Sequence, residues 1–236
     1  MKLKVKLPLA LVLIGLIPAI IISIITLQSS SQVLIDNKFD QLFSLKQVKQ
    51  SAVERYLQLL DAQSQTMSVN PTVIDGIKQF SDTFGSYAEE LNVTDGNAAK
   101  FEIKDHYNRE FITTLREADP AATVNSDTLV RGFSINTLAL QQQYISQNPN
   151  STGNKHFLNA APTDSNYDRV HANFHPYFRK YLEDFGYYDV FLINASGDVV
   201  YSVFKEIDYA TSLVSGPYSG SGLAKAYKGA LNLGRD

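Results

Sequence analysis

The feature that most constrains this 236-residue chain is an uncharged, apolar segment from Leu7 to Leu27. About 20 apolar residues in a helix span the hydrocarbon core of a bilayer, which is roughly 30 Å thick. The alternative is a cleavable signal peptide, whose apolar region is usually about 7–15 residues long and ends at a small-residue cleavage site. The run here is longer, and Gln28-Ser-Ser-Ser-Gln32 offers no such site. We therefore expect an uncleaved transmembrane helix at residues 7–27.

Basic residues predict the orientation of this helix. Three lysines precede it, and no acidic residue does: Lys2, Lys4 and Lys6. The next basic residue is Lys38. Basic residues favour the cytoplasmic side of a membrane. Residues 1–6 are therefore expected in the cytoplasm, and the bulk of the chain in the periplasm, anchored to the inner (cytoplasmic) membrane.

The charge and composition of the exported part exclude several classes of function. Without the three N-terminal lysines, 18 of the 21 basic residues remain against 24 acidic residues, which gives a formal charge of −6. Nucleic-acid binding requires a basic face, so no nucleic-acid partner is expected. The chain has no cysteine, which excludes disulfides, thiol catalysis and cysteine-ligated zinc.

Amphipathic helices are expected along most of the exported part. Residues 29–69 carry apolar side chains at steps of three or four without Gly or Pro, as in a helix that packs on partner helices or in a coiled coil. Asn70-Pro71 ends this rod and begins another helix, with Asn as the N-cap and Pro at the first position. Further helices are expected at residues 71–91, 98–118, 128–146 and 167–185, the last kinked or split at Pro176 and ended by Gly186.

After Gly186 the pattern changes to that of a β-hairpin. Residues 187–193 and 199–204 are rich in β-branched and aromatic residues, and turn residues join them. A glycine-rich loop and a short helix at residues 223–231 follow. A two-stranded hairpin is marginal alone and leaves unpaired edges. We expect it to pair with another chain or, as the favoured alternative, with strands beyond residue 236 of a longer protein.

Motifs for catalysis or metal binding are weak. His171 and His175 are one helical turn apart, a spacing that can place two imidazoles on one metal, and Asp168 lies one turn before them. The glutamate of the zinc-protease signature is absent, so these histidines are expected to be hydrogen-bonded within the fold. The loop of residues 216–222 lacks the Gly-Lys-Ser/Thr ending of a phosphate-binding loop. We therefore expect no enzyme, no metal and no cofactor.

Aromatic and charged residues gather around the predicted hairpin, as they do in pockets for small molecules. Tyr201 is the first candidate, because a phenol can pack against a ligand and also hydrogen-bond to it. Arg179 and Asp208 are candidates for contacting an acidic and a basic group of the ligand, respectively. Tyr188 and Asp189 complete the candidate set. The alternative is that these are ordinary core aromatics and surface charges.

The stretch from Phe185 to Leu213, FGYYDVFLINASGDVVYSVFKEIDYATSL, resembles the start of a Cache sensor module of bacterial methyl-accepting chemotaxis proteins. The preceding segment from Tyr167 to Arg179 is similar to the same group, and so is the order of the parts. The resemblance implies a mostly helical α+β fold that ends in the start of an antiparallel, PAS-like sheet. Its segments are residues 1–6, the transmembrane helix 7–27, the extracytoplasmic helical region 28–166 and an incomplete Cache-type module 167–236.

The resemblance also implies a function. It indicates a transmembrane, chemoreceptor-like signal transducer that senses a small molecule outside the membrane for chemotaxis and acts as a homodimer. Two alternatives stay open. The chain is otherwise expected to be the sensor region of a membrane histidine kinase or cyclic-nucleotide enzyme, or an anchored periplasmic structural protein.

Overall fold

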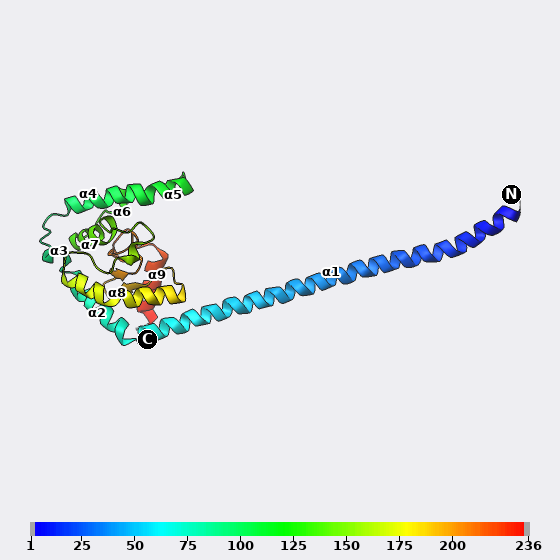
Figure 1. The fold of residues 1–236 in the computed structure, drawn as a ribbon, viewed down its shortest axis with the longest axis horizontal. Coiled ribbons are helices and arrows are strands. Elements are labelled where there is room, and N and C mark those ends of the chain that lie inside the picture. Colours follow the sequence, from blue (N-terminus) through cyan, green and yellow to red (C-terminus); the bar gives the residue numbers. More distant parts are fainter. Residues whose placement is uncertain (1–2, 234–236) are drawn as a thin grey trace. The chain divides into compact units, whose positions relative to one another are not determined.

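The computed structural model describes residues 3–233, and the chain divides into two units between Met67 and Ser68. The first unit is formed by α1 (Leu3–Ser68), one uninterrupted helix of 66 residues (Figure 1). The expected membrane span and the expected rod after it are therefore one continuous helix. Residues 1–2 of the predicted cytoplasmic segment and residues 234–236 of the predicted Cache-type module lie outside the described part. The side chains of Lys2, Lys4 and Lys6 lie outside it as well.

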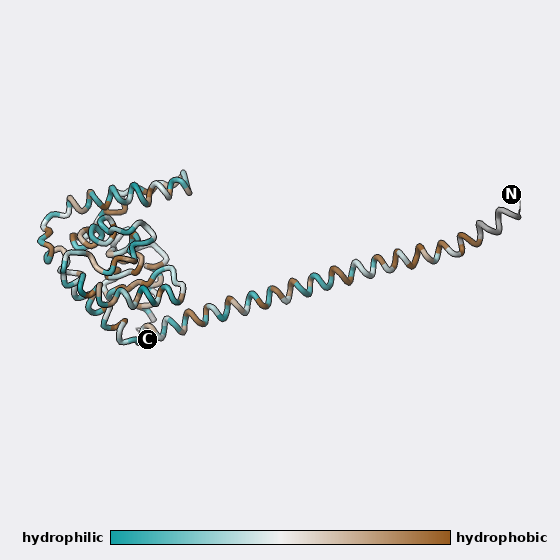
Figure 2. The backbone as a smooth tube through the Cα atoms, in the orientation of Figure 1, coloured by the Kyte–Doolittle hydropathy of each residue, from teal (hydrophilic) through white to brown (hydrophobic). Residues whose placement is uncertain are grey.

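The N-terminal part of α1 is long and apolar enough to cross a membrane, and no other helix among residues 3–233 has this property. Figure 2 shows that apolar residues predominate there, whereas apolar and polar residues alternate farther along the helix. Ile14, Ile22 and Leu27 all leave more than half of their side-chain surface uncovered. A bilayer supplies the apolar surroundings that such side chains require. These features confirm one candidate membrane-spanning helix near the N-terminus.

Short helices make up most of the second unit. Asn70 caps the first of them as predicted, because its side-chain oxygen accepts a hydrogen bond from the Thr72 N–H at 2.8 Å and Pro71 follows in the first turn. The helical segments before residue 160 are α2 (Pro71–Phe84), α3 (Tyr87–Glu90), α4 (Asn97–His106), the π-helix η1 (Tyr107–Ile112), α5 (Thr113–Ala118), α6 (Ser126–Leu129), α7 (Ile135–Gln141), the π-helix η2 (Gln142–Ser146) and the 3-10 helix η3 (Lys155–Phe157).

Of two helices predicted in this region, one is confirmed and the other is wrong. The prediction for residues 98–118 is confirmed in extent, since α4, η1 and α5 follow one another without a break. The single helix predicted at residues 128–146 is wrong. Gly132 has a φ of +78°, in the left-handed region that cannot continue a right-handed helix. Ser134 then caps α7 by accepting a hydrogen bond from the Thr137 N–H at 3.0 Å.

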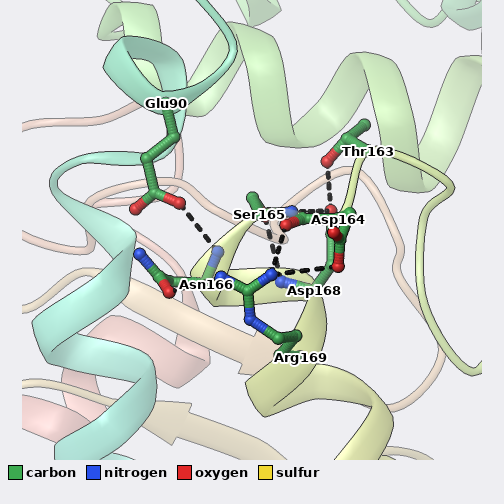
Figure 3. Close-up of polar contacts among 7 residues, drawn as sticks. All are labelled: Glu90, Thr163, Asp164, Ser165, Asn166, Asp168 and Arg169. Atoms are coloured by element: carbon green, nitrogen blue, oxygen red, sulfur yellow. Dashed lines mark hydrogen bonds and ion pairs between the residues drawn. The ribbon is translucent and has the colours of Figure 1, made fainter.

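The helix α8 (Asn166–Phe185) carries much of the buried surface of this unit. It continues through Pro176, so the expected split does not occur, and Gly186 ends it at a φ of +68° as predicted. Its start is a capping box (Figure 3). The Ser165 hydroxyl accepts from the Asp168 N–H at 3.1 Å, and the Asp168 carboxylate accepts from the Ser165 N–H at 3.2 Å.

Buried Asp168 also ties α8 to its neighbours. Its carboxylate accepts hydrogen bonds from the hydroxyls of Tyr144 on η2, at 2.7 Å, and of Thr163 in the preceding loop. Figure 3 shows a further tie, in which the Glu90 carboxylate accepts from the Asn166 N–H at 2.7 Å. These bonds fix the start of α8 against α3 and η2.

The predicted hairpin is present as β1 (Phe191–Ile193) and β2 (Val199–Ser202), paired antiparallel. Gly197 in the turn has a φ of +86°, as a tight hairpin turn requires. The other edge of β2 is paired at its first residue, because the Val199 N–H donates to the Thr211 carbonyl at 2.9 Å and the Val199 carbonyl accepts from the Ala210 N–H at 3.1 Å. The chain after the hairpin thus covers an edge that was expected to be open.

The hairpin is also covered on its faces. β2 is buried along its whole length. Val199 packs with Leu213 and with Ala224 of α9 (Gly222–Leu233), and the Tyr201 ring lies 4.7 Å from the Phe80 ring of α2. The second unit is therefore mostly helical with a small two-stranded antiparallel sheet, which confirms the coarse α+β prediction. The Cache assignment stays a prediction.

We expect Asp168→Asn to lower the free energy of unfolding by about 2 kcal/mol, because one carboxylate oxygen becomes an amide nitrogen and cannot accept the hydrogen bonds of buried donors. Asp164→Asn is the matched control. Its exposed carboxylate pairs with Arg169 at 2.9 Å, and losing this pair should cost less than about 1 kcal/mol. Chemical denaturation measures both losses, and equal losses would contradict the structural role given to Asp168.

Candidate functional site

A cavity of about 530 Å³ opens in the second unit between helix 106–118 and the segment that follows β2. Figure 1 shows the α4–α5 helix that forms one wall. The volume falls within the range of about 300–1,000 Å³ that is typical of small-molecule pockets. The lining residues come from this helix, from η2, from the loop after η2 and from the ends of the hairpin: His106, Tyr107, Glu110, Phe111, Thr114, Leu115, Ala118, Ile145, Thr152, Gly153, Lys155, Tyr188, Phe204, Lys205, Glu206 and Ile207.

Two π-helices shape the cavity. η1 contributes Tyr107 to the lining, and η2 contributes Ile145. A π-helical turn differs from the α-helix in its hydrogen-bond spacing, and such turns are frequent at functional sites. The buried Tyr107 hydroxyl donates to the Gln141 side-chain oxygen at 2.6 Å, and the Gln141 amide donates to the Tyr209 carbonyl at 2.6 Å. This chain of bonds fixes the helical wall to the segment after the hairpin.

Lys155 is a nearly buried cation in the cavity wall, with 4% of its surface exposed. Its Nζ donates to the Ile145 carbonyl at 2.8 Å. In the described part of the chain, no carboxylate oxygen lies within 4.0 Å of it. Burial lowers its pKa. Burial and the charge of Lys155 together lower the pKa of neighbouring His106 to about 4, so His106 is a neutral imidazole at pH 7.

Lys205, also in the lining, is almost completely buried. Its Nζ donates to the carbonyls of Ser202 and Val203. The same ammonium lies 4.5 Å from the centre of the Tyr201 ring and 5.5 Å from that of Tyr209, distances at which a cation is attracted to an aromatic face. Burial lowers the pKa of Lys205 to about 7, against the opposing charge of Asp189, which raises it.

The acidic residues of the lining are exposed, in contrast to the lysines. The Thr152 hydroxyl donates to Glu110 at 3.3 Å, and the Tyr188 hydroxyl donates to Glu206 at 2.8 Å. The bond to Glu206 raises the pKa of Tyr188 to about 12. The positively charged side chains of the cavity wall are therefore buried, and its negatively charged side chains are exposed.

Of the predicted ligand-binding residues, Tyr188 lines the cavity and Tyr201 does not. Tyr201 is fully buried, and its hydroxyl lies 2.6 Å from Nδ1 of His175. The other ring nitrogen of His175, Nε2, lies 2.7 Å from the His156 carbonyl, which can only accept, so Nε2 carries the hydrogen. In the neutral ring Nδ1 is then the acceptor, and the Tyr201 hydroxyl is its donor.

The remaining predicted residues lie outside the cavity lining. The Asp189 carboxylate accepts from the Val203 N–H at 2.9 Å and so braces the hairpin, and burial raises its pKa to about 6. Arg179 pairs with Glu183 at 3.8 Å on the surface of α8. Asp208 has a buried carboxylate oxygen without a hydrogen-bond partner, and burial raises its pKa to about 6. The structure thus brings Tyr188 alone of this set to the cavity.

His171 and His175 stack on each other at 4.5 Å and are both fully buried. Nδ1 of His171 donates to the Asn159 carbonyl at 2.5 Å, which leaves Nε2 as an acceptor that no described group reaches. Burial, and then the charge of Lys205, hold the pKa of both histidines well below its usual range. Among residues 3–233, the structure contains no cluster of three or more metal-ligating side chains of the His, Cys, Asp and Glu types.

Tyr188 is the one lining residue that was named as a candidate from the sequence, and the missed residues include His106, Tyr107 and Lys155. Lys155 lies in the polar loop of residues 147–166, whose sequence gives no sign of burial. The one available signal was the aromatic and basic Asn-Lys-His-Phe run at residues 154–157 within that loop.

Comparison with known proteins adds no relative. No protein-family model, no curated protein and no solved structure matches this chain.

The buried histidines make stability sensitive to acid. When the pKa of a histidine is lower in the folded chain than in the unfolded chain, the unfolded chain takes up the proton at a higher pH. The free energy of unfolding therefore has its full value above about pH 6.5 and falls as the pH drops below that value. His171→Asn keeps a donor for the Asn159 carbonyl but cannot take up a proton. We expect the fall in unfolding free energy between pH 6.5 and 5 to be shallower in this variant, by up to about 1.4 kcal/mol per pH unit.

The measurement is chemical denaturation of wild type and variant at several pH values. Asp189 and Asp208, whose folded pKa values are raised, contribute the opposite slope below about pH 6, and they do so equally in both proteins. Parallel pH profiles for the two proteins would contradict a neutral, buried His171.

Proposed function

We propose that the chain is a membrane-anchored sensor that binds a small molecule in the 530 Å³ cavity. The cavity carries this proposal, because aromatic and apolar walls combined with a few placed charges are typical of ligand pockets. The unit that contains it follows directly on α1, which holds the candidate membrane span. The orientation proposed from the lysine cluster puts the cavity outside the cytoplasm.

We further propose that this sensor belongs to a chemoreceptor-like signal transducer. The support is the sequence resemblance of residues 185–213 to the Cache modules of methyl-accepting chemotaxis proteins. In such a role, the ligand must bind two arrangements of the protein with different affinity, since only differential affinity shifts an equilibrium.

The part of α1 after the membrane span supports a homodimer. Phe39, Leu42, Val48 and Tyr56 recur at helical spacing there, and each leaves more than half of its surface uncovered. A water-exposed helix with an apolar stripe of this length requires a partner. A second copy of α1 would bury this stripe in a coiled-coil contact.

The cavity assignment can be tested with two neighbouring threonines of α5. Thr114 lines the cavity, and Thr113 does not; both are exposed and hydrogen-bonded to the helix backbone. A thermal-shift screen of small molecules on the full chain in detergent should give compounds that raise its melting temperature. We expect Thr114→Trp to weaken binding of these compounds at least about tenfold, because the indole fills part of the cavity.

Thr113→Trp is the control for adding an indole to this helix, and calorimetry should find wild-type affinity for it. Compounds that bind both tryptophan variants as tightly as wild type would place the ligand elsewhere. If no compound from the screen binds Thr114→Trp more weakly than it binds wild type, the proposed function is contradicted.

The orientation is tested by a fusion after Asp236. Alkaline phosphatase, which is active only when exported, should be active there because three lysines precede the span. Replacing Lys2, Lys4 and Lys6 by glutamate should lower that activity, whereas replacing Lys38, Lys46 and Lys49 should leave it unchanged. An inactive phosphatase together with an active cytoplasmic reporter at the same position would reverse the orientation.

A further inference from the structure

The two lysines of the cavity wall differ in how well their ammonium groups are satisfied. Lys205 donates to two carbonyls and lies against tyrosine faces, so its ammonium already has several partners within the fold. The Lys155 ammonium donates to the Ile145 carbonyl, and that is the one hydrogen bond of this ammonium among the residues that the structure describes. An ammonium has three donors. Lys155 is therefore a nearly buried cation with two donors to spare.

The surroundings of Lys155 supply no counter-charge at contact distance. The charge of Glu110 acts on Lys155 and favours its charged form, yet no ion pair within 4.0 Å joins the two in the described part of the chain. A buried charge without a partner is costly, and an anion that enters the cavity would offset that cost. Neutral His106, in the same wall, can add a ring N–H to such an anion.

The rest of the cavity wall determines the chemistry of the ligand beyond its anionic group. Phe111, Leu115 and Phe204 line the cavity with apolar surface. Of the two ammonium groups in the wall, that of Lys205 is already bonded to two carbonyls, so Lys155 and one neutral imidazole are left to match a single negative charge. A phosphate dianion would call for several cations or a guanidinium fork, and the lining contains no arginine. The chemistry thus favours a carboxylate over a phosphate.

We propose that the ligand is a small organic monocarboxylate whose acid group binds Lys155 and whose apolar part packs against Phe111, Leu115 and Phe204. This inference rests on the proposed function, since it names the class of ligand that the cavity takes. It assigns Lys155 as the residue that distinguishes an acid from its neutral analogue.

The test compares acids with their amides. Hexanoate, benzoate and phenylacetate are titrated into the full chain in detergent by calorimetry, alongside hexanamide, benzamide and phenylacetamide. At least one acid should bind wild type about ten- to a hundredfold more tightly than its amide, the range for a hydrogen bond to a charged group. Lys155→Met should lose this preference while keeping its affinity for the amide.

Two further variants complete the test. Lys155→Arg keeps the charge and should keep a preference for the acid. Lys100→Met removes an exposed lysine of α4 that does not line the cavity, and it should bind like wild type. The acid–amide comparison on wild type decides the question even if Lys155→Met folds poorly, which its melting temperature reports.

The outcomes separate this inference from the proposed function. If acid and amide bind wild type equally, or if Lys155→Met keeps the preference, the carboxylate inference is overturned while the cavity stands. If no carboxylate binds at 10 mM but neutral screening hits are lost in Thr114→Trp, the inference fails in the same way. If no compound of any class is affected by Thr114→Trp, the proposed function itself fails.

Discussion

The interaction on which most of the second unit depends is the burial of the Lys205 ammonium. A lysine is almost never fully buried unless its charge is compensated. Here the compensation comes from the carbonyls of Ser202 and Val203 and from the faces of tyrosine rings that different segments contribute: Tyr144 from η2, Tyr201 from β2 and Tyr209 from the chain after the hairpin. One charge thus fixes three segments around a common point, and residues 204–207 leave that point to form a wall of the cavity.

The polar groups around this charge follow from it. Burial disfavours a charged imidazole, and the nearby Lys205 cation adds to this effect, so His171 and His175 are held neutral and each offers a carbonyl-bound N–H. The Tyr201 hydroxyl then has His175 as its acceptor. On the other side, Asp189 braces the end of the hairpin with a carboxylate that the charge of Lys205 favours. The Tyr201 side chain therefore belongs to the core, and the cavity is lined by residues within the range 106–155, by Tyr188 and by residues 204–207.

Sequence reasoning succeeded where local signals act and failed where distant segments meet. Asn70 and Gly186 are helix ends with strong local chemistry, and the Gly197 turn was found for the same reason. The break at Gly132 was missed, because one glycine in a helical pattern is weak evidence of an end. The cavity was missed more fully. Its walls join residues about a hundred positions apart, as in the 3.2 Å bond from the Tyr107 hydroxyl to the Ile207 carbonyl, and no local pattern reports such a contact.

The measurement that tests the central role of Lys205 most directly is an NMR titration of the full chain in detergent with ¹³Cε-labelled lysine. Lys205→Met identifies the resonance of Lys205 by its disappearance, and free lysine, whose ordinary pKa is about 10.4, provides the reference. A Lys205 resonance that titrates well below the pKa of free lysine is the predicted result, because burial disfavours the charged form. A Lys205 resonance that titrates at the ordinary lysine pKa of about 10.4 would show that its ammonium is in water and would contradict the account.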